Sequence, residues 1–303
     1  MSALLTHLTA VERLAARIND LPPGFAKALS EDLEYARFGA ALPELPRFGG
    51  FGRGLETWFS RGKDPHFTSL MTTKAPVHFG LKAAELVSNG ALVGVNAGLA
   101  FLAGYFTRLC VAKSLDPLVE KLLLTRRKQG ELVAMARARI EWSQSLFFMS
   151  DLHGSPLVGT PAVRAKLQLR KASSTVKGIG RGLYELLRVS SLEALGEAPT
   201  NAEVDGWMRG IYAFSMVLGS PLGKLKVDLR DKFLYRADGV DVFAAVDAGL
   251  ATTREVLAVL ASLIRRNSWT ARSRARVLSL LPEGPLLHDA EDLGEHDIIA
   301  SQG

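Results

Sequence analysis

The amino-acid sequence predicts an all-α fold. Leu4, His7, Val11, Leu14 and Ile18 fall at alternating three- and four-residue steps, which places them on one face of a first helix. The alternation of apolar and polar residues that marks half-buried strands is rare, and no run of hairpin turns occurs. With 303 residues, 48% of them hydrophobic, the chain can form one large domain or two small ones.

Further helices follow along the first half of the chain. The sequence Leu21-Pro22-Pro23-Gly24 ends the first helix. We expect helices over 25–35, 76–89, 91–113 and 115–147, and a long loop over the glycine- and proline-rich segment 40–54. Asp116-Pro117 suits the start of the helix over 115–147, because proline is tolerated in a first helical turn.

The second half is also predicted to be helical. Helical patterns cover 160–188, 202–218, 241–266 and 269–281, and Ser268 or Thr270 is a candidate N-cap for the last of them. No linker rich in proline, glycine or serine requires a domain boundary, so we expect one helical domain over 1–282. Residues 283–303 hold six acidic residues and no lysine or arginine, which predicts an acidic, disordered tail.

The composition limits the location and the partners only broadly. The net charge of +6 is compatible with acidic proteins, anionic membranes and nucleic acid, but stacking aromatic residues are sparse around the basic segment 164–188, which argues against nucleic acid. A single cysteine, Cys110, excludes an intramolecular disulfide and fits a reducing compartment. Charged residues at four positions of 1–20 interrupt any signal-peptide core. We therefore expect a cytoplasmic protein.

One apolar segment could be mistaken for a membrane span. Residues 90–107 carry no charge and include glycines at four-residue spacing. Asn89 and Asn96 interrupt the segment, and its length is at the lower limit for crossing a bilayer. A helix that is apolar all round is also typical of the centre of a large helical domain, so we predict a buried helix and no transmembrane segment.

The segment 104–117 resembles the metal-binding helix of the bacterial zinc-dependent phospholipase C family. That family's pattern is roughly G-Y-x-T-H-x-x-x-D-x-x-x-H-P, and this chain begins the segment with Gly104-Tyr105-Phe106-Thr107. The metal ligands, however, are replaced: Arg108 and Asp116 stand at the histidine positions and Ala112 at the aspartate position.

Other segments resemble the same family in the same order. Leu5-Thr6-His7-Leu8 is similar to its opening T-H-x motif, and 39–46 to its G-x-x-x-P-D loop with Glu44 at the aspartate position. Val77-His78-Phe79 is similar to a further histidine ligand, and 137–141 to an H-x-x-x-E pair. The resemblance implies a multi-helix, phospholipase C-like bundle over about 4–147, with a helical extension over about 160–282. It also implies a remodelled metal pocket built from His7, Glu44, His78, Arg108, Ala112, Asp116, Arg137 and Glu141.

The replacements argue against the family's chemistry. Arginine stays protonated and cannot donate an electron pair to zinc, and alanine has no donor. We therefore expect no trinuclear zinc site, no cofactor and no hydrolase activity. A single residual metal at His7, His78 and a carboxylate is an alternative, although each of these histidines also fits a buried core position.

We hypothesise that the two arginines replace the charge of the metal. A carboxylate left in a cavity without its metal is costly, and a guanidinium binds carboxylates well. Arg108 and Arg137 would then pair with Glu44, Asp116 and Glu141. The alternative is a set of independent surface charges.

The leading prediction for function is a catalytically inactive, phospholipase C-like protein that acts by binding, as a cytoplasmic adaptor, scaffold or regulator of a protein partner. A second possibility is an enzyme with metal-independent chemistry, in which Arg108 and Arg137 bind a small anionic substrate and Glu44 or Glu141 transfers protons. A third is peripheral binding of anionic lipid through a basic face. If Phe147 and Phe148 filled the cavity, catalysis would be excluded.

Overall fold

The computed structural model is mostly helical over the residues that it describes, which confirms the predicted all-α class. These residues are 3–49, 66–90, 94–127, 133–154, 157–167, 169, 180–220, 236–237, 239–281 and 283–284. Their only strands are β1 (Arg236–Ala237) and β2 (Val240–Asp241), a short antiparallel pair.

The first helices follow the predicted periodicity, with three corrections. They are α1 (Ala3–Ala15), η1 (Ile18–Asp20), α2 (Pro23–Glu31), α3 (Leu33–Ala41) and the 3-10 helix η2 (Leu42–Phe48). The first helix ends at Ala15, before Ile18 and before its predicted end at 21–24, and a short 3-10 helix follows it. The helix predicted over 25–35 is interrupted at Asp32, whose backbone leaves the helical region. The loop predicted over 40–54 is wrong for 40–48, which are helical. Leu42, Leu45 and Phe48 are buried at three-residue steps, which is the period of a 3-10 helix. Residues 50–54 lie outside the described part.

The middle of the chain forms the longest helices. They follow the short α5 (His66–Ser69) and η4 (Leu70–Lys74), and are α6 (Pro76–Ser88), α7 (Val95–Arg127) and α8 (Val133–His153). The predicted boundary at Asp116-Pro117 is wrong, because α7 runs through Pro117. Leu115, Leu118 and Val119 are buried on both sides of this proline, so tertiary packing outweighs its cost of about 3 kcal/mol in a helix.

The second half contains α9 (Pro161–Leu167), α10 (Gly180–Leu195), α11 (Asn201–Leu218), α12 (Val242–Arg266) and α13 (Ala271–Leu280). The last three match the predicted ranges to within two residues. Thr270, one of the two candidate caps, accepts a hydrogen bond from the backbone N–H of Ser273 at the start of α13. The prediction of one helix over 160–188 is wrong at Leu167, where α9 ends, and most of 168–179 lies outside the described part.

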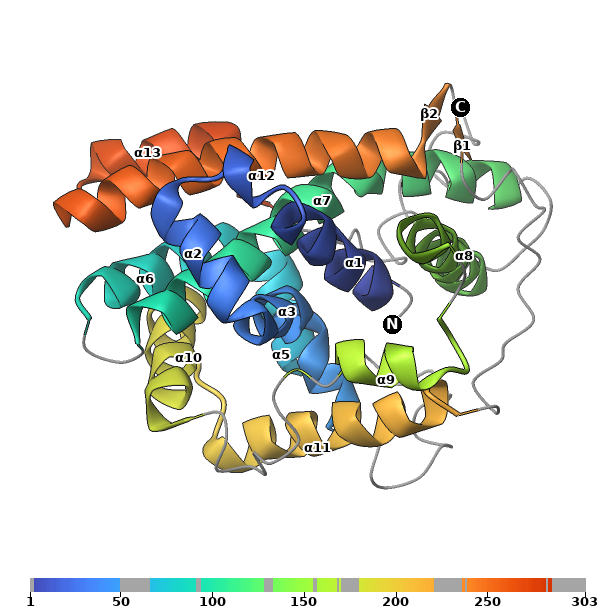
Figure 1. Cartoon of the computed structure of the whole chain (residues 1–303), viewed down its shortest axis with the longest axis horizontal. Coiled ribbons are helices and arrows are strands. Elements are labelled where there is room, and N and C mark those ends of the chain that lie inside the picture. The colour runs from blue at the N-terminus through green and yellow to red at the C-terminus, as the bar shows by residue number, and fades with distance from the viewer. Residues whose placement is uncertain are drawn as a thin grey trace, which may run out of the picture.

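Helix α7 passes through the centre of the molecule, with α3 and α12 packed along it. Figure 1 shows α12 and α13 along one edge and α11 along the opposite edge. Two glycines permit the close contact of α3 with α7: a Cβ on Gly104 would lie 1.8 Å from the Ala36 carbonyl oxygen, and one on Gly39 would lie 2.2 Å from that of Phe101.

Within the described part, one helix is long and apolar enough to cross a membrane. It is the stretch Val95–Leu124 of α7, and 78% of its most apolar window is buried inside the protein. Neighbouring helices therefore cover the apolar surface of this segment, as expected for a central helix and not for a membrane span.

The predicted acidic tail lies outside the described residues except at its start. Glu283 accepts hydrogen bonds from the backbone N–H groups of Val77 and His78, each at 3.0 Å, at the beginning of α6. A carboxylate is favourable at this position, because the first N–H groups of a helix have no partner within it.

Candidate functional site: an ion-pair pocket

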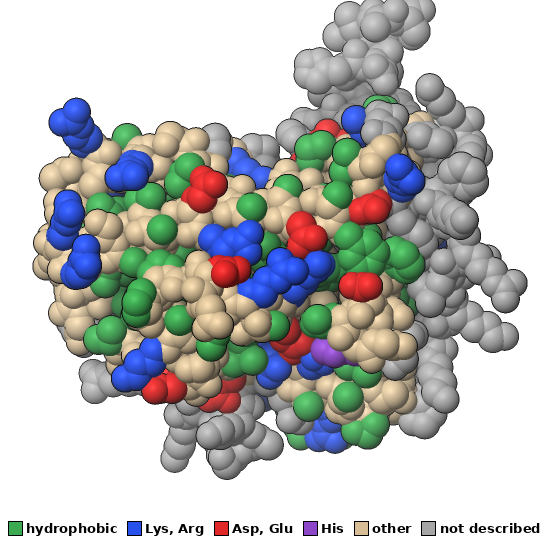
Figure 2. Space-filling view, turned by 45° about the horizontal axis from the view of Figure 1, so that its top comes forward, with side chains coloured by type: hydrophobic (Ala, Val, Ile, Leu, Met, Phe, Trp, Pro, Cys, Tyr) green, Lys and Arg blue, Asp and Glu red, His purple; other side chains and the backbone are tan. Residues whose placement is uncertain are grey.

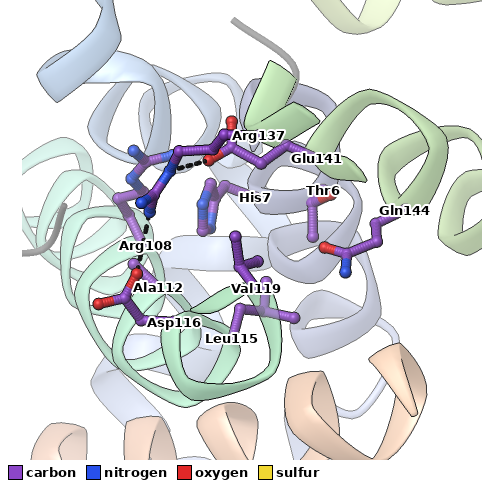
Figure 3. Close-up of a pocket in the computed structure, with 10 residues that line it drawn as sticks. All are labelled: Thr6, His7, Arg108, Ala112, Leu115, Asp116, Val119, Arg137, Glu141 and Gln144. Atoms are coloured by element: carbon purple, nitrogen blue, oxygen red, sulfur yellow. Dashed lines mark hydrogen bonds and ion pairs between the residues drawn. The ribbon is translucent and has the colours of Figure 1, made fainter. Parts of the chain in front are cut away.

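A small pocket lies between α1, α7 and α8, and it contains most of the predicted site residues (Figure 3). Its volume is about 30 Å³, which is enough for only a few water molecules. Six of the eight predicted residues line it, namely His7, Arg108, Ala112, Asp116, Arg137 and Glu141. Thr6, Leu115, Val119 and Gln144 complete the lining.

Arg108 and Glu44 form a buried ion pair beside this pocket. Nη2 of Arg108 donates to Oε1 of Glu44 at 2.8 Å, and the two side chains are 1% and 2% exposed. Glu44 also accepts a hydrogen bond from Nη1 of Arg47 at 3.0 Å. Arg108 comes from α7, while Glu44 and Arg47 come from η2, so the pair fastens this 3-10 helix to the central helix.

The charge of Glu44 is stabilised in spite of its burial. Burial alone would raise the pKa of this carboxyl, but the guanidinium groups of Arg47 and Arg108 hold the pKa well below its ordinary range. Glu44 is therefore ionised at neutral pH, and its negative charge offsets the permanent positive charge of Arg108.

Arg137 binds two carboxylates at once. Its Nη2 donates to Oδ1 of Asp116 and its Nε to Oε1 of Glu141, both at 3.0 Å. Burial alone would lower the pKa of this guanidinium, but Glu141 and Asp116 raise it above its ordinary value. The three side chains are 13–15% exposed, and they connect α7 with α8.

The predicted pairing of the two arginines with the three carboxylates is present. Arg108, Ala112 and Asp116 share one face of α7 at four-residue steps, because the helix is continuous through Pro117. The small side chain of Ala112 leaves room for the pocket beside them (Figure 3). The alternative of independent surface charges is therefore wrong for these residues.

His7 points inward from α1, as its position on the apolar face predicts. Its side chain is 1% exposed, and burial, with a smaller contribution from the charge of Arg108, lowers its pKa well below the ordinary value. The imidazole is therefore neutral at neutral pH. Within the described part of the chain, Nδ1 of His7 and both Nε and Nη1 of Arg108 are buried without a hydrogen-bond partner.

His78 does not belong to this pocket, which corrects the prediction. Its side chain is 52% exposed, and its Nδ1 lies 2.5 Å from Oε2 of Glu283. The buried face of α6 is formed by residues such as Val77, Gly80 and Leu81, so the position next to Val77 turns outward. The residual metal site predicted at His7, His78 and a carboxylate is not formed, since the two histidines do not converge.

The pocket is not filled by Phe147 and Phe148 either. Their rings instead contact Phe243 of α12, with ring centroids 5.2 and 5.8 Å away. The apolar side of the pocket comes from α7, through Leu115 and Val119. The pocket is small, and it is lined by the ion-paired side chains on one side and by these aliphatic side chains on the other.

Sequence reasoning missed several participants. Arg47 lies three residues after Glu44, and this spacing would have suggested a contact in a 3-10 helix. The hydroxyl groups of Thr6 and Ser145 form a buried hydrogen bond of 2.7 Å between α1 and α8. Their separation of 139 residues leaves no local signal in the sequence.

Two other features bear on the chemistry. Burial raises the pKa of the Cys110 thiol to about 12, so the nucleophilic thiolate does not form at neutral pH. Among the residues that the structure describes, no group of three or more histidine, cysteine, aspartate or glutamate side chains is arranged to hold a metal ion.

Comparison of this chain with models of protein families, with curated proteins and with solved structures found no match.

Proposed function

We propose that this chain is a catalytically inactive, cytoplasmic binding protein, an adaptor, scaffold or regulator, with a phospholipase C-like arrangement in its first half. The observation that supports the proposal is the buried ion pair of Arg108 with Glu44. The zinc-dependent phospholipase C family, which this chain resembles, has metal-binding residues at the positions of Arg108 and Glu44. In this chain the two side chains neutralise each other's charge.

The second ion-pair group supports the same proposal. A general base must be able to accept a proton from a substrate. Asp116 and Glu141 each accept a charge-assisted hydrogen bond from Arg137, so one oxygen of each carboxylate is already held by the protein and not offered to a substrate. A cavity of about 30 Å³ is also too small for a phospholipid headgroup. The former metal pocket then contributes to stability, and binding would use the outer surfaces.

Two measurements on the purified, unchelated full-length protein test this proposal. Elemental mass spectrometry is expected to find less than about a tenth of an equivalent of zinc, iron or manganese, because arginine is no ligand. Assays with a chromogenic phosphodiester, with and without added zinc, are expected to give no turnover above the no-protein rate. The proposal would be overturned if the protein held one equivalent of metal tightly and His7→Gln abolished that binding. Zinc-dependent turnover of the phosphodiester would also overturn it.

A second candidate is favoured by the unpaired donors of the pocket. Nε and Nη1 of Arg108 suit a small anion, and Nδ1 of His7 adds a third donor in the tautomer that carries its proton there, as in the alternative of an enzyme acting on an anionic substrate. Binding of an anion would raise the melting temperature in proportion to the logarithm of its concentration. Thermal shifts with phosphate, acetate and chloride test this candidate. Equal shifts for the wild type and for His7→Gln would reject it.

A further inference from the structure

The α12–α13 hairpin is basic at its closed end. Helix α12 ends at Arg266, Asn267 turns the chain with a φ of 45°, and Thr270 caps α13. Between residues 256 and 282 the sequence contains five arginines, no lysine and no acidic residue. In Figure 1 this closed end projects at the left end of the molecule.

Four of the five arginines are exposed and have no ion pair within the described part of the chain. The fifth, Arg274, donates to Oε2 of Glu85 on α6 at 2.8 Å. We refer to the remaining four as the hairpin arginines: Arg265, Arg266, Arg272 and Arg276. Figure 2 shows basic side chains gathered at the same left end, with no acidic side chain among them.

Helix stability does not account for this cluster. Arg265 and Arg266 lie in the last turn of α12, where positive charge is favourable. Arg272, in contrast, is the second residue of α13, where positive charge is unfavourable, and the first turn of α13 contains no acidic residue. Four like charges at one end of the molecule also repel one another. The arrangement therefore lowers stability unless an anionic partner compensates for it.

We propose that the hairpin arginines form a binding surface for anionic phospholipid membranes. All four are arginine, whose planar guanidinium binds phosphate oxygens in pairs, whereas lysine is a single point charge. The four side chains are exposed, and the closed end of the hairpin projects at the left end of the molecule in Figure 1, so a bilayer can approach this end. The inference rests on the proposed function, since it names a partner for a protein that acts by binding.

The same surface is less suited to single-stranded nucleic acid. Trp269 is the only aromatic residue of 244–303, and its indole N–H donates to Oγ of Ser88 at 2.9 Å. The ring is thus held against α6 and does not serve as a stacking platform for a base. Without base stacking, a nucleic acid could contact this surface only through its phosphates, and a phospholipid headgroup offers the same contact.

Vesicle co-sedimentation of the full-length protein tests the proposal. Phosphatidylcholine vesicles are compared with vesicles of three parts phosphatidylcholine to one part phosphatidylserine. We expect binding only to the anionic vesicles, and a large loss on raising NaCl from about 0.05 M to about 0.5 M, because salt screens exposed charges. Equal binding to both vesicle types, or no binding to either at the lower salt concentration, would overturn the proposal.

A matched pair of variants locates the surface. The hairpin variant replaces Arg265, Arg266, Arg272 and Arg276 by glutamine. The control replaces four exposed basic residues elsewhere in the chain by glutamine, namely Arg17, Lys27, Arg209 and Arg236. Each basic residue near an anionic membrane contributes about fivefold to partitioning, so the loss of four charges should weaken binding of the hairpin variant by nearly three orders of magnitude. The control should lose much less, and equal losses would overturn the proposal.

Two further readouts separate the outcomes. The hairpin variant should keep the helical circular dichroism and have a melting temperature at least as high as that of the wild type, since none of its four side chains forms an ion pair within the described part and their mutual repulsion is removed. A labelled DNA duplex and a labelled DNA single strand are tested in parallel, and tighter binding to either than to the anionic vesicles would overturn the membrane assignment. Phosphodiesterase activity would reject the proposed function whatever the vesicle result, whereas absent vesicle binding without activity would reject only this surface.

Discussion

Arg108 of α7 and Glu44 of η2, 64 residues apart in the sequence, form an ion pair that is almost completely excluded from solvent. Neither charge would be tolerated at this depth alone, because moving an isolated ion out of water costs many kcal/mol. Their contact therefore couples the position of the 3-10 helix to that of the central helix. It also leaves the pocket with a partly unsatisfied guanidinium and a neutral histidine.

Breaking this pair from one side should be strongly destabilising. Arg108→Met leaves the buried Glu44 with the half-buried Arg47 beside it, and Glu44→Gln takes the carboxylate away from Arg108. We expect each variant to lose about 3–5 kcal/mol of unfolding free energy, measured by urea denaturation. The double variant Arg108→Met/Glu44→Gln should lose clearly less than the sum. Strict additivity would show that the two charges do not stabilise each other.

Acid should destabilise the protein in two stages. Because the folded pKa of His7 lies below its unfolded value of about 6.5, the unfolded state binds a proton first, and stability falls as the pH drops below that value. The lowered pKa of Glu44 adds a second loss below its unfolded value of about 4.3. Between about pH 6.5 and pH 5 the wild type should lose up to about 1.4 kcal/mol of unfolding free energy per pH unit because of His7. His7→Gln should not show this loss.

The control for this prediction is Gly206→Ala, which changes a residue of α11 outside the pocket and adds no ionisable group. It should keep the wild-type pH dependence of the unfolding free energy between about pH 7 and pH 5 in the same denaturation experiment. If His7→Gln kept that dependence as fully as the control does, His7 would not be its source.

The contact between α3 and α7 should be intolerant of a single methyl group. Gly104→Ala would place a Cβ 1.8 Å from the carbonyl oxygen of Ala36, so the helices must separate, at a cost of about 1–3 kcal/mol or more. Gly206→Ala in α11 is the matched control, because a Cβ at that position would meet no side chain or neighbouring element within 4 Å. It should stabilise the protein by about 1 kcal/mol through helix propensity. Thermal and urea unfolding compare the two.

The carboxylate at the start of α6 should protect that helix. Glu283→Ala removes the acceptor of the Val77 and His78 backbone N–H groups, and we expect a loss of about 1 kcal/mol with faster amide hydrogen exchange at these residues. Glu255→Ala, on the exposed face of α12, is the control and should change neither quantity. Unchanged exchange in Glu283→Ala would mean that the contact is not formed in solution.

The sequence alone predicted the helical class, the last three helices and much of the pocket. Helical periodicity depends on the residues of one segment, so α11, α12 and α13 were predicted almost to their ends. The arginine–carboxylate pairs were predicted for a similar reason. Arg137 and Glu141 are one helical turn apart, and Arg108 and Asp116 share a helix face.

Only the tertiary structure decided the features that depend on contacts between distant segments. Packing against neighbouring helices keeps α7 helical through Pro117, although local propensity favours a break there. The docking of α6 turns His78 away from the pocket and towards Glu283, 205 residues further along the chain. Local sequence records which conformation a segment prefers. The packing of the whole chain decides which face of that segment is buried and which charged side chains lie next to it.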